Sequence, residues 1–120
     1  MRFVTVVKLV LAGSPAGALP NVRVSLFDHD NFSRDDLIGT AMTDARGEAR
    51  FDYTTESFAD LDEKLGAEFP DLYAVAYDAQ GREVASTRGD IIPNTARKTI
   101  TLSIARDVAQ QHELLPAMPA

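Results

Sequence analysis

Short runs in which apolar and polar residues alternate follow one another along this chain, and turn-forming residues separate them. Successive side chains of a strand point to opposite faces, so a period of two lets each run bury one face of a sheet. Many short strands joined by turns favour an all-β fold, and we predict an antiparallel β-sandwich of seven to eight strands. The runs that we assign to strands cover residues 2–11, 21–27, 37–43, 48–53, 71–78, 82–87 and 98–105.

One segment departs from this period. Phe58, Leu61 and Leu65 recur at the spacing of one helical face, which predicts one short helix at about 55–65. The chain of 120 residues is long enough for a single hydrophobic core. We therefore expect one β-sandwich domain at 1–105, followed by a polar, proline-containing C-terminal tail at 106–120.

The chain carries a formal net charge of -6 and contains no cysteine. A negative surface does not neutralise phosphates, so we expect no nucleic-acid partner. The lack of cysteine excludes disulfides, thiol catalysis and thiolate metal sites. The two histidines, His29 and His112, are too few for a zinc site built on several histidines.

The first run, residues 2–11, begins like a signal peptide, with a basic residue before apolar ones. Lys8 interrupts the apolar residues and the run alternates, so we interpret it as the first strand. No apolar run in the chain approaches the about 20 residues that a transmembrane helix needs. We expect a soluble protein without a convincing signal peptide, for which a cytoplasmic location is slightly favoured.

Acidic residues gather in the loop between the second and third predicted strands, at residues 28–36. Asp28 and Asp30 lie two positions apart and point the same way from an extended chain, and Asp36 returns after the loop. Carboxylates grouped in this way could hold Ca²⁺, which takes oxygen ligands. The alternative is a solvated loop whose aspartates accept backbone hydrogen bonds and stabilise turns.

Three segments together resemble the transthyretin-like family. They read VRVSLFDHD at 22–30, DDLIG at 35–39 and TDARG at 43–47, and Phe51 follows the last. The resemblance covers about residues 2–104 and implies a prealbumin-like sandwich of seven or eight strands. It implies no firm activity, because members of the family are mostly binding or signalling proteins. The cysteines of the family are missing here.

The acidic loop also resembles, locally, the calcium loop of the membrane-binding domains of protein kinase C and synaptotagmin. In those domains Asp-x-Asp is followed six residues later by another aspartate, and Asp28, Asp30 and Asp36 keep that spacing. The resemblance implies a Ca²⁺ site at these three residues. Such domains take a second pair of aspartates from another loop, for which Asp78 or Asp90 would have to serve here.

Transthyretin-related enzymes of the same fold hydrolyse 5-hydroxyisourate. The family pattern needs a histidine near the N-terminus, a further histidine and arginine, and a C-terminal Tyr-Arg-Gly-Ser. This chain has no histidine before His29, and residues 115–120 read LPAMPA. We therefore expect no enzyme, and a hydroxyisourate-hydrolase-like activity is kept only as an alternative.

Spaced apolar residues in the tail, Leu114, Leu115 and Met118, could insert into a partner. We also expect edge strands, such as 71–78 or 98–105, that could pair across a dimer, because an unprotected edge invites pairing. We expect a non-catalytic binding or assembly module that engages protein partners or associates with itself. The alternative is a calcium-dependent binding module that uses the acidic loop 28–36.

Overall fold

The structure is a computed structural model that describes residues 2–12, 17–29, 35–54, 71–91 and 99–114. The predicted helix at 55–65 lies outside these residues. The elements within them are β1 (Arg2–Leu11), β2 (Arg23–Asp28), β3 (Asp36–Met42), β4 (Glu48–Thr54), β5 (Leu72–Tyr77), β6 (Glu83–Ser86), the 3-10 helix η3 (Arg88–Asp90), β7 (Thr99–Ile104) and α1 (Arg106–Gln111).

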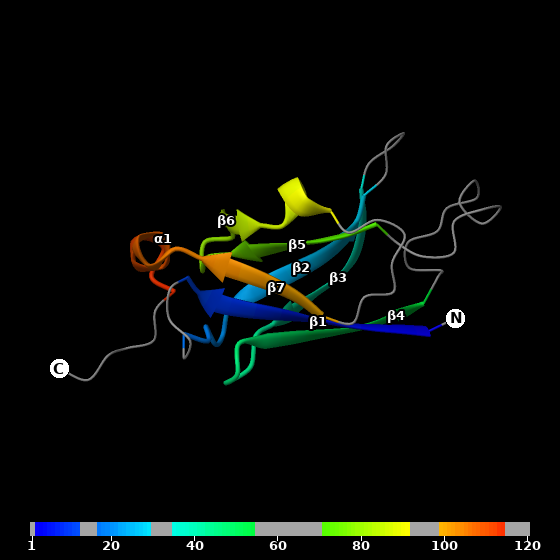
Figure 1. Cartoon of the computed structure of the whole chain (residues 1–120), viewed down its shortest axis with the longest axis horizontal. Coiled ribbons are helices and arrows are strands. Elements are labelled where there is room, and N and C mark those ends of the chain that lie inside the picture. Colours follow the sequence, from blue (N-terminus) through cyan, green and yellow to red (C-terminus); the bar gives the residue numbers. More distant parts are fainter. Residues whose placement is uncertain (1, 13–16, 30–34, 55–70, 92–98, 115–120) are drawn as a thin grey trace.

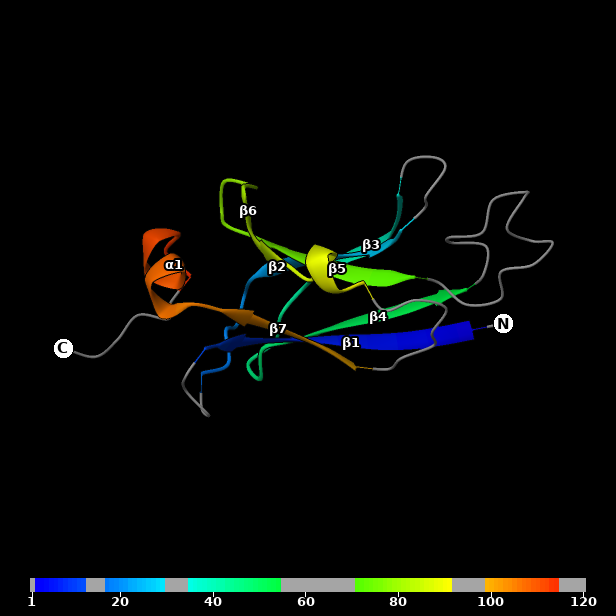
Figure 2. The ribbon, with the colours of Figure 1, turned by 45° about the horizontal axis from the view of Figure 1, so that its top comes forward.

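The strands form two sheets that lie one above the other (Figures 1 and 2), with the orders β4-β1-β7 and β3-β2-β5-β6. This arrangement confirms the predicted all-β sandwich. The register of β1 with β4 is antiparallel, as are those of β2 with β3, β2 with β5, and β5 with β6. The alternation in the sequence therefore predicted both the existence and the approximate limits of the strands.

The pair of β1 and β7 departs from the antiparallel expectation. The two strands run parallel, with Val6 opposite Thr99 and Leu11 opposite Ile104. Because β6 lies in the other sheet, the chain crosses between sheets before β7, and such a crossover allows a parallel neighbour. Alternation reports which face of a strand is buried, but it does not report the direction of the neighbouring strand.

The core lies between the sheets, and β1, β2, β4 and β7 contribute alternate residues to it. Val7 and Leu9 of β1 are fully buried, as are Val24 and Leu26 of β2, and Ile104 of β7 is almost so. Burial of a side chain of this size stabilises a fold by about 1.5–3 kcal/mol relative to exposure. Apolar positions of the alternating runs thus supply the core.

Strand β5 occupies the interior of its sheet, between β2 and β6. Its burial is continuous from Leu72 to Ala76, so both of its faces are covered. The expectation that residues 71–78 form a pairing edge is therefore wrong, because both sides of β5 are already hydrogen-bonded. Strand β7 pairs only with β1 among the described residues and does lie at an edge.

The hairpin turn between β3 and β4 is fixed by an aspartate and a glycine. The Asp44 carboxylate accepts hydrogen bonds from the amides of Arg46, at 2.8 Å, and Glu48, at 3.0 Å. These bonds hold the pKa of Asp44 below its usual value. Gly47 has φ +75°, and a Cβ there would lie 2.6 Å from the Leu9 carbonyl oxygen. This turn therefore requires glycine at position 47.

Residues 106–114, which the sequence assigned to a tail, continue the folded structure. Helix α1 covers residues 106–111 at the end of the sandwich opposite the N-terminus (Figure 1). Ala109 is fully buried, and Val108 and Leu114 pack against the core. The folded part of the chain consequently extends beyond the expected limit at residue 105.

Candidate functional site

The structure describes two of the three aspartates predicted to bind Ca²⁺, Asp28 and Asp36. Asp28 is only 4% exposed, and its carboxylate accepts a hydrogen bond from the Asp71 amide at 2.8 Å. Asp36 lies opposite Asp28 in the pairing of β2 with β3, and Asp30 lies outside the described residues. Within the part of the chain that the structure describes, no three acidic or histidine residues form a group that could hold a metal ion. Asp28 instead joins the end of β2 to the start of β5.

Asp78, which would have to complete such a site, lies at the other end of the same sheet. Asp28 is opposite Leu72, whereas Arg23 is opposite Tyr77, the residue before Asp78. Asp78 lies six positions of about 3.3 Å each beyond Leu72, or about 20 Å along the strand. One cation cannot be bound by both carboxylates at that separation.

The acidic-loop end of the sheet carries a network centred on Tyr73. The Tyr73 hydroxyl donates to Asp35 at 2.5 Å, and His29 Nδ1 lies 3.2 Å from the other oxygen of Asp35. The Tyr73 ring stacks on Phe27 at 5.1 Å, and the Arg88 guanidinium lies 5.2 Å above it. Burial, with the bond to Asp35, raises the pKa of Tyr73 to about 12. This network ties the ends of β2, β3 and β5 together.

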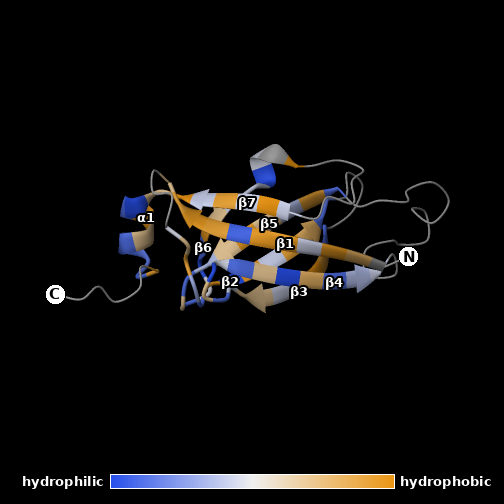
Figure 3. Cartoon of the chain, turned by 60° about the horizontal axis from the view of Figure 1, so that its bottom comes forward, coloured by the Kyte–Doolittle hydropathy of each residue, from blue (hydrophilic) through white to orange (hydrophobic). Residues whose placement is uncertain are grey.

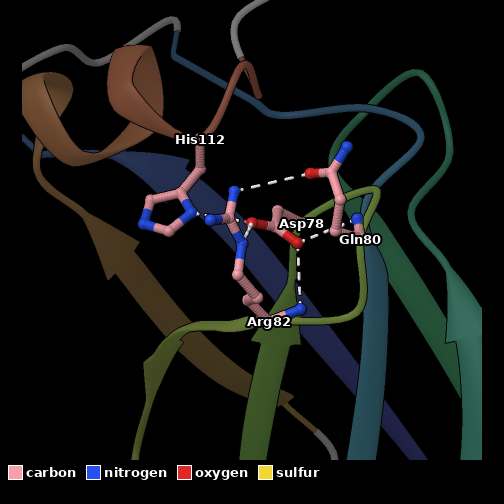
Figure 4. Close-up of polar contacts among 4 residues, drawn as sticks. All are labelled: Asp78, Gln80, Arg82 and His112. Carbon is pink, nitrogen blue, oxygen red and sulfur yellow. Dashed lines mark hydrogen bonds and ion pairs between the residues drawn. The ribbon is translucent and has the colours of Figure 1, made fainter.

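The opposite end of the sheet is organised around the buried carboxylate of Asp78 (Figure 4). Its Oδ1 accepts hydrogen bonds from the backbone amides of Gln80 and Arg82, both at 2.9 Å. Its Oδ2 lies 2.8 Å from Arg82 Nε and 2.8 Å from His112 Nδ1. The bond to His112, followed by those to Arg82 and Gln80, holds the pKa of Asp78 well below its usual range. One carboxylate thus connects the β5–β6 turn to the end of α1.

A hollow of about 600 Å³ lies beside this network. Its lining brings together Arg23 of β2, Met42 of β3, Tyr77 and Asp78 of β5 and its turn, and Leu114 after α1. A smaller hollow of about 350 Å³ shares Arg23 and Tyr77 with it. The cation and the phenol therefore line both hollows.

Sequence reasoning missed this hollow. Alternation in β2 already placed Arg23 on the outward face, but its partners in the lining come from strands and a helix far along the chain. Among the tail residues proposed to bind partners, Leu114 packs against this domain, while Leu115 and Met118 lie outside the described residues. The spacing of Val108, Ala109 and His112 fits one face of a helix, and this pattern could have predicted α1.

The edge strands differ in how they are protected from pairing with another chain. The outward residues of β4 include Glu48, Arg50 and Asp52, and Figure 3 shows β4 with several hydrophilic bands. The pairing of β3 with β2 has a register shift, and β6 is four residues long. Strand β7 contains neither charge nor proline, and its register with β1 is regular. It is the least protected edge among the described strands.

The comparisons with known proteins bear on the fold alone. No protein-family model matches the chain, and no curated protein does. Among solved structures, the 9R-lipoxygenase from Cyanothece PCC8801 is similar with a TM-score of 0.54 and 15% sequence identity. The match covers 87% of this chain and 16% of the lipoxygenase chain, so it concerns a small part of that enzyme. The transthyretin-like resemblance stays a prediction.

Among the residues that the structure describes, no helix is long and apolar enough to cross a membrane.

Proposed function

We propose that this chain is a non-catalytic assembly module whose β7 edge pairs with the β7 edge of a second copy. The observation that carries the proposal is the composition of this edge. Strand β7 reads TITLSI, with Thr99, Thr101 and Ser103 exposed and the alternate residues buried. An edge of six residues without charge, proline or bulge leaves backbone groups available to another strand.

Charge supports a second copy as the partner. Two chains that each carry a net charge of -6 repel one another unless their contact surfaces lack acidic residues. The β7 edge meets this condition, because its outward side chains are hydroxyls and the adjacent outward residues of β1, Val6, Lys8 and Val10, are not acidic. Pairing through β4 would instead bring Glu48 and Asp52 near their copies.

The proposed dimer follows from the symmetry of the pairing. A two-fold axis near Thr101 would place two β7 strands antiparallel and join two three-stranded sheets into one of six strands. Facing threonine and serine side chains contribute about 0.2–1 kcal/mol for each cross-strand pair. The backbone hydrogen bonds of the new ladder add to this contribution.

The test is the oligomeric state of the full chain, measured by sedimentation velocity over a range of concentrations. Thr101→Lys places a charge in the middle of the β7 edge, and we expect it to convert the dimer to a monomer. Thr54→Lys is the matched control, because it makes the same change at an exposed threonine of the opposite edge strand. A wild-type chain that stays monomeric, or a Thr101→Lys variant that stays dimeric, would refute the proposal.

A further inference from the structure

We propose that the larger hollow at Arg23 binds a small organic acid, with its carboxylate on Arg23 and its apolar chain along Met42 and Leu114. This site lies on the four-stranded sheet, whereas β7 belongs to the three-stranded one. The inference is therefore independent of the proposed dimer.

Three side chains form the floor of the site in one row across three strands. Arg23 of β2 lies opposite Met42 on one side and opposite Tyr77 on the other. Within the described residues, no hydrogen bond or ion pair joins the Arg23 guanidinium or the Tyr77 hydroxyl to another group. An arginine fork matches the two oxygens of a carboxylate, and the adjacent phenol can donate a further hydrogen bond.

That Arg23 forms no ion pair with another described residue is informative, because the chain has more acidic than basic residues. Lys8, Arg50, Arg82 and Arg88 each form an ion pair with an acidic side chain. Arg23 faces a hollow instead, so its charge is available to an anion from solution. The net negative charge of the chain makes a single small anion a better fit than a strongly acidic macromolecule.

The remaining lining determines which anions fit. Met42 is 55% exposed, and Leu114 is partly exposed, so both offer apolar surface to a ligand. A volume of about 600 Å³ lies within the range of small-molecule sites. The charge of Asp78 is already paired with the Arg82 guanidinium at 2.8 Å, which reduces its repulsion of the ligand. Glu113 also lines the hollow and is exposed, so it weakens the attraction modestly.

The wall formed by residues 113 and 114 depends on the contact between His112 and Asp78. Helix α1 ends at Gln111, and Glu113 takes a φ of 59°, which turns the chain back. The Leu114 amide then bonds to the Ala109 carbonyl at 2.8 Å. His112 is therefore a positioning residue, because it holds the wall against the β5–β6 turn without lining the hollow.

The test compares two ligands of equal chain length, octanoate and octanol, by amide chemical shifts of the isotope-labelled full chain. We expect octanoate to shift Arg23, Tyr77 and Leu114 in a saturable manner and octanol to bind about tenfold more weakly, since a hydrogen-bonded charge is worth about that factor. Equal affinities, shifts elsewhere, or no saturable shift with octanoate would overturn the proposal.

Single-residue variants test separately the charge of Arg23 and the wall formed by residues 113 and 114. Arg23→Gln should weaken octanoate about tenfold and leave octanol unchanged, because only octanoate uses the charge. Arg46→Gln, which makes the same change in the β3–β4 turn, should alter neither. Glu113→Gln should tighten octanoate alone, and His112→Ala should weaken both ligands. If the Arg23→Gln variant bound octanoate as tightly as the wild type, the proposed site would be contradicted. The Thr101→Lys variant should bind octanoate normally whatever its oligomeric state, so the test is separate from that of the dimer.

Discussion

Thr43 provides a test of how much two buried hydrogen bonds contribute to the stability of this fold. Its hydroxyl accepts a hydrogen bond from the Val22 amide at 2.9 Å and donates one to the Leu19 carbonyl at 2.7 Å. Thr43 is 3% exposed, Val22 2% and Leu19 0%. Thr43→Val keeps the shape of the side chain but removes both bonds, which leaves a buried donor and a buried acceptor without these partners. Each of the two groups costs about 1–3 kcal/mol, so we expect a loss of about 2–6 kcal/mol.

The control is Thr43→Ser, which keeps the hydroxyl and removes one methyl group. Loss of a buried methyl group costs about 1 kcal/mol, so this smaller side chain should be the better tolerated of the two. Both variants are measured by equilibrium unfolding in urea, with an unchanged dependence on urea as the sign of a common unfolded state. If Thr43→Val proved as stable as Thr43→Ser, the two hydrogen bonds would not matter and the reasoning would be wrong.

Three further predictions concern other parts of the molecule. Gly47→Ala should lower the free energy of unfolding in urea by more than about 1 kcal/mol, and by more than Gly81→Ala does. Both glycines have positive φ, but only a Cβ at position 47 meets a backbone oxygen. The folded state binds the Tyr73 proton more tightly than the unfolded chain, since its pKa rises from 10.0 to about 12. This contribution to stability is complete below pH 10 and is lost as the pH rises towards 12, so Tyr73→Phe should flatten the alkaline decline measured by urea unfolding. His112→Ala should speed amide hydrogen exchange in α1 more than in β1, because it removes the bond to Asp78 that holds the end of α1. Equal effects on both elements would show that this bond does not hold α1.

The strands were predictable because a half-buried strand leaves its period in the sequence. Residues 98–105 were assigned from alternation alone, and β7 covers Thr99–Ile104. The position of β5 was missed although its signal was present. The segment LYAVAY carries no charge on either face, which is typical of a strand that is covered on both sides.

The candidate sites were predictable only in part. Alternation places Asp28 on the same face as Val24 and Leu26, so its burial could have been foreseen and a structural role preferred. The hollow at Arg23 could not have been foreseen. It needs Tyr77 opposite Arg23 and Leu114 in the same lining, and neither neighbour follows from local sequence.

The parallel pair of β1 and β7 has a consequence for how the chain folds. Strand β1 is the middle strand of its sheet, and one of its two neighbours, β7, is the last of the described strands. The entropic cost of closing this long loop must be met before the pairing contributes stability, and folding rates fall as such distant contacts increase. A nascent chain can form the β2–β3 and β5–β6 hairpins early. The three-stranded sheet must wait for β7, and until then β1 presents an open side to other chains.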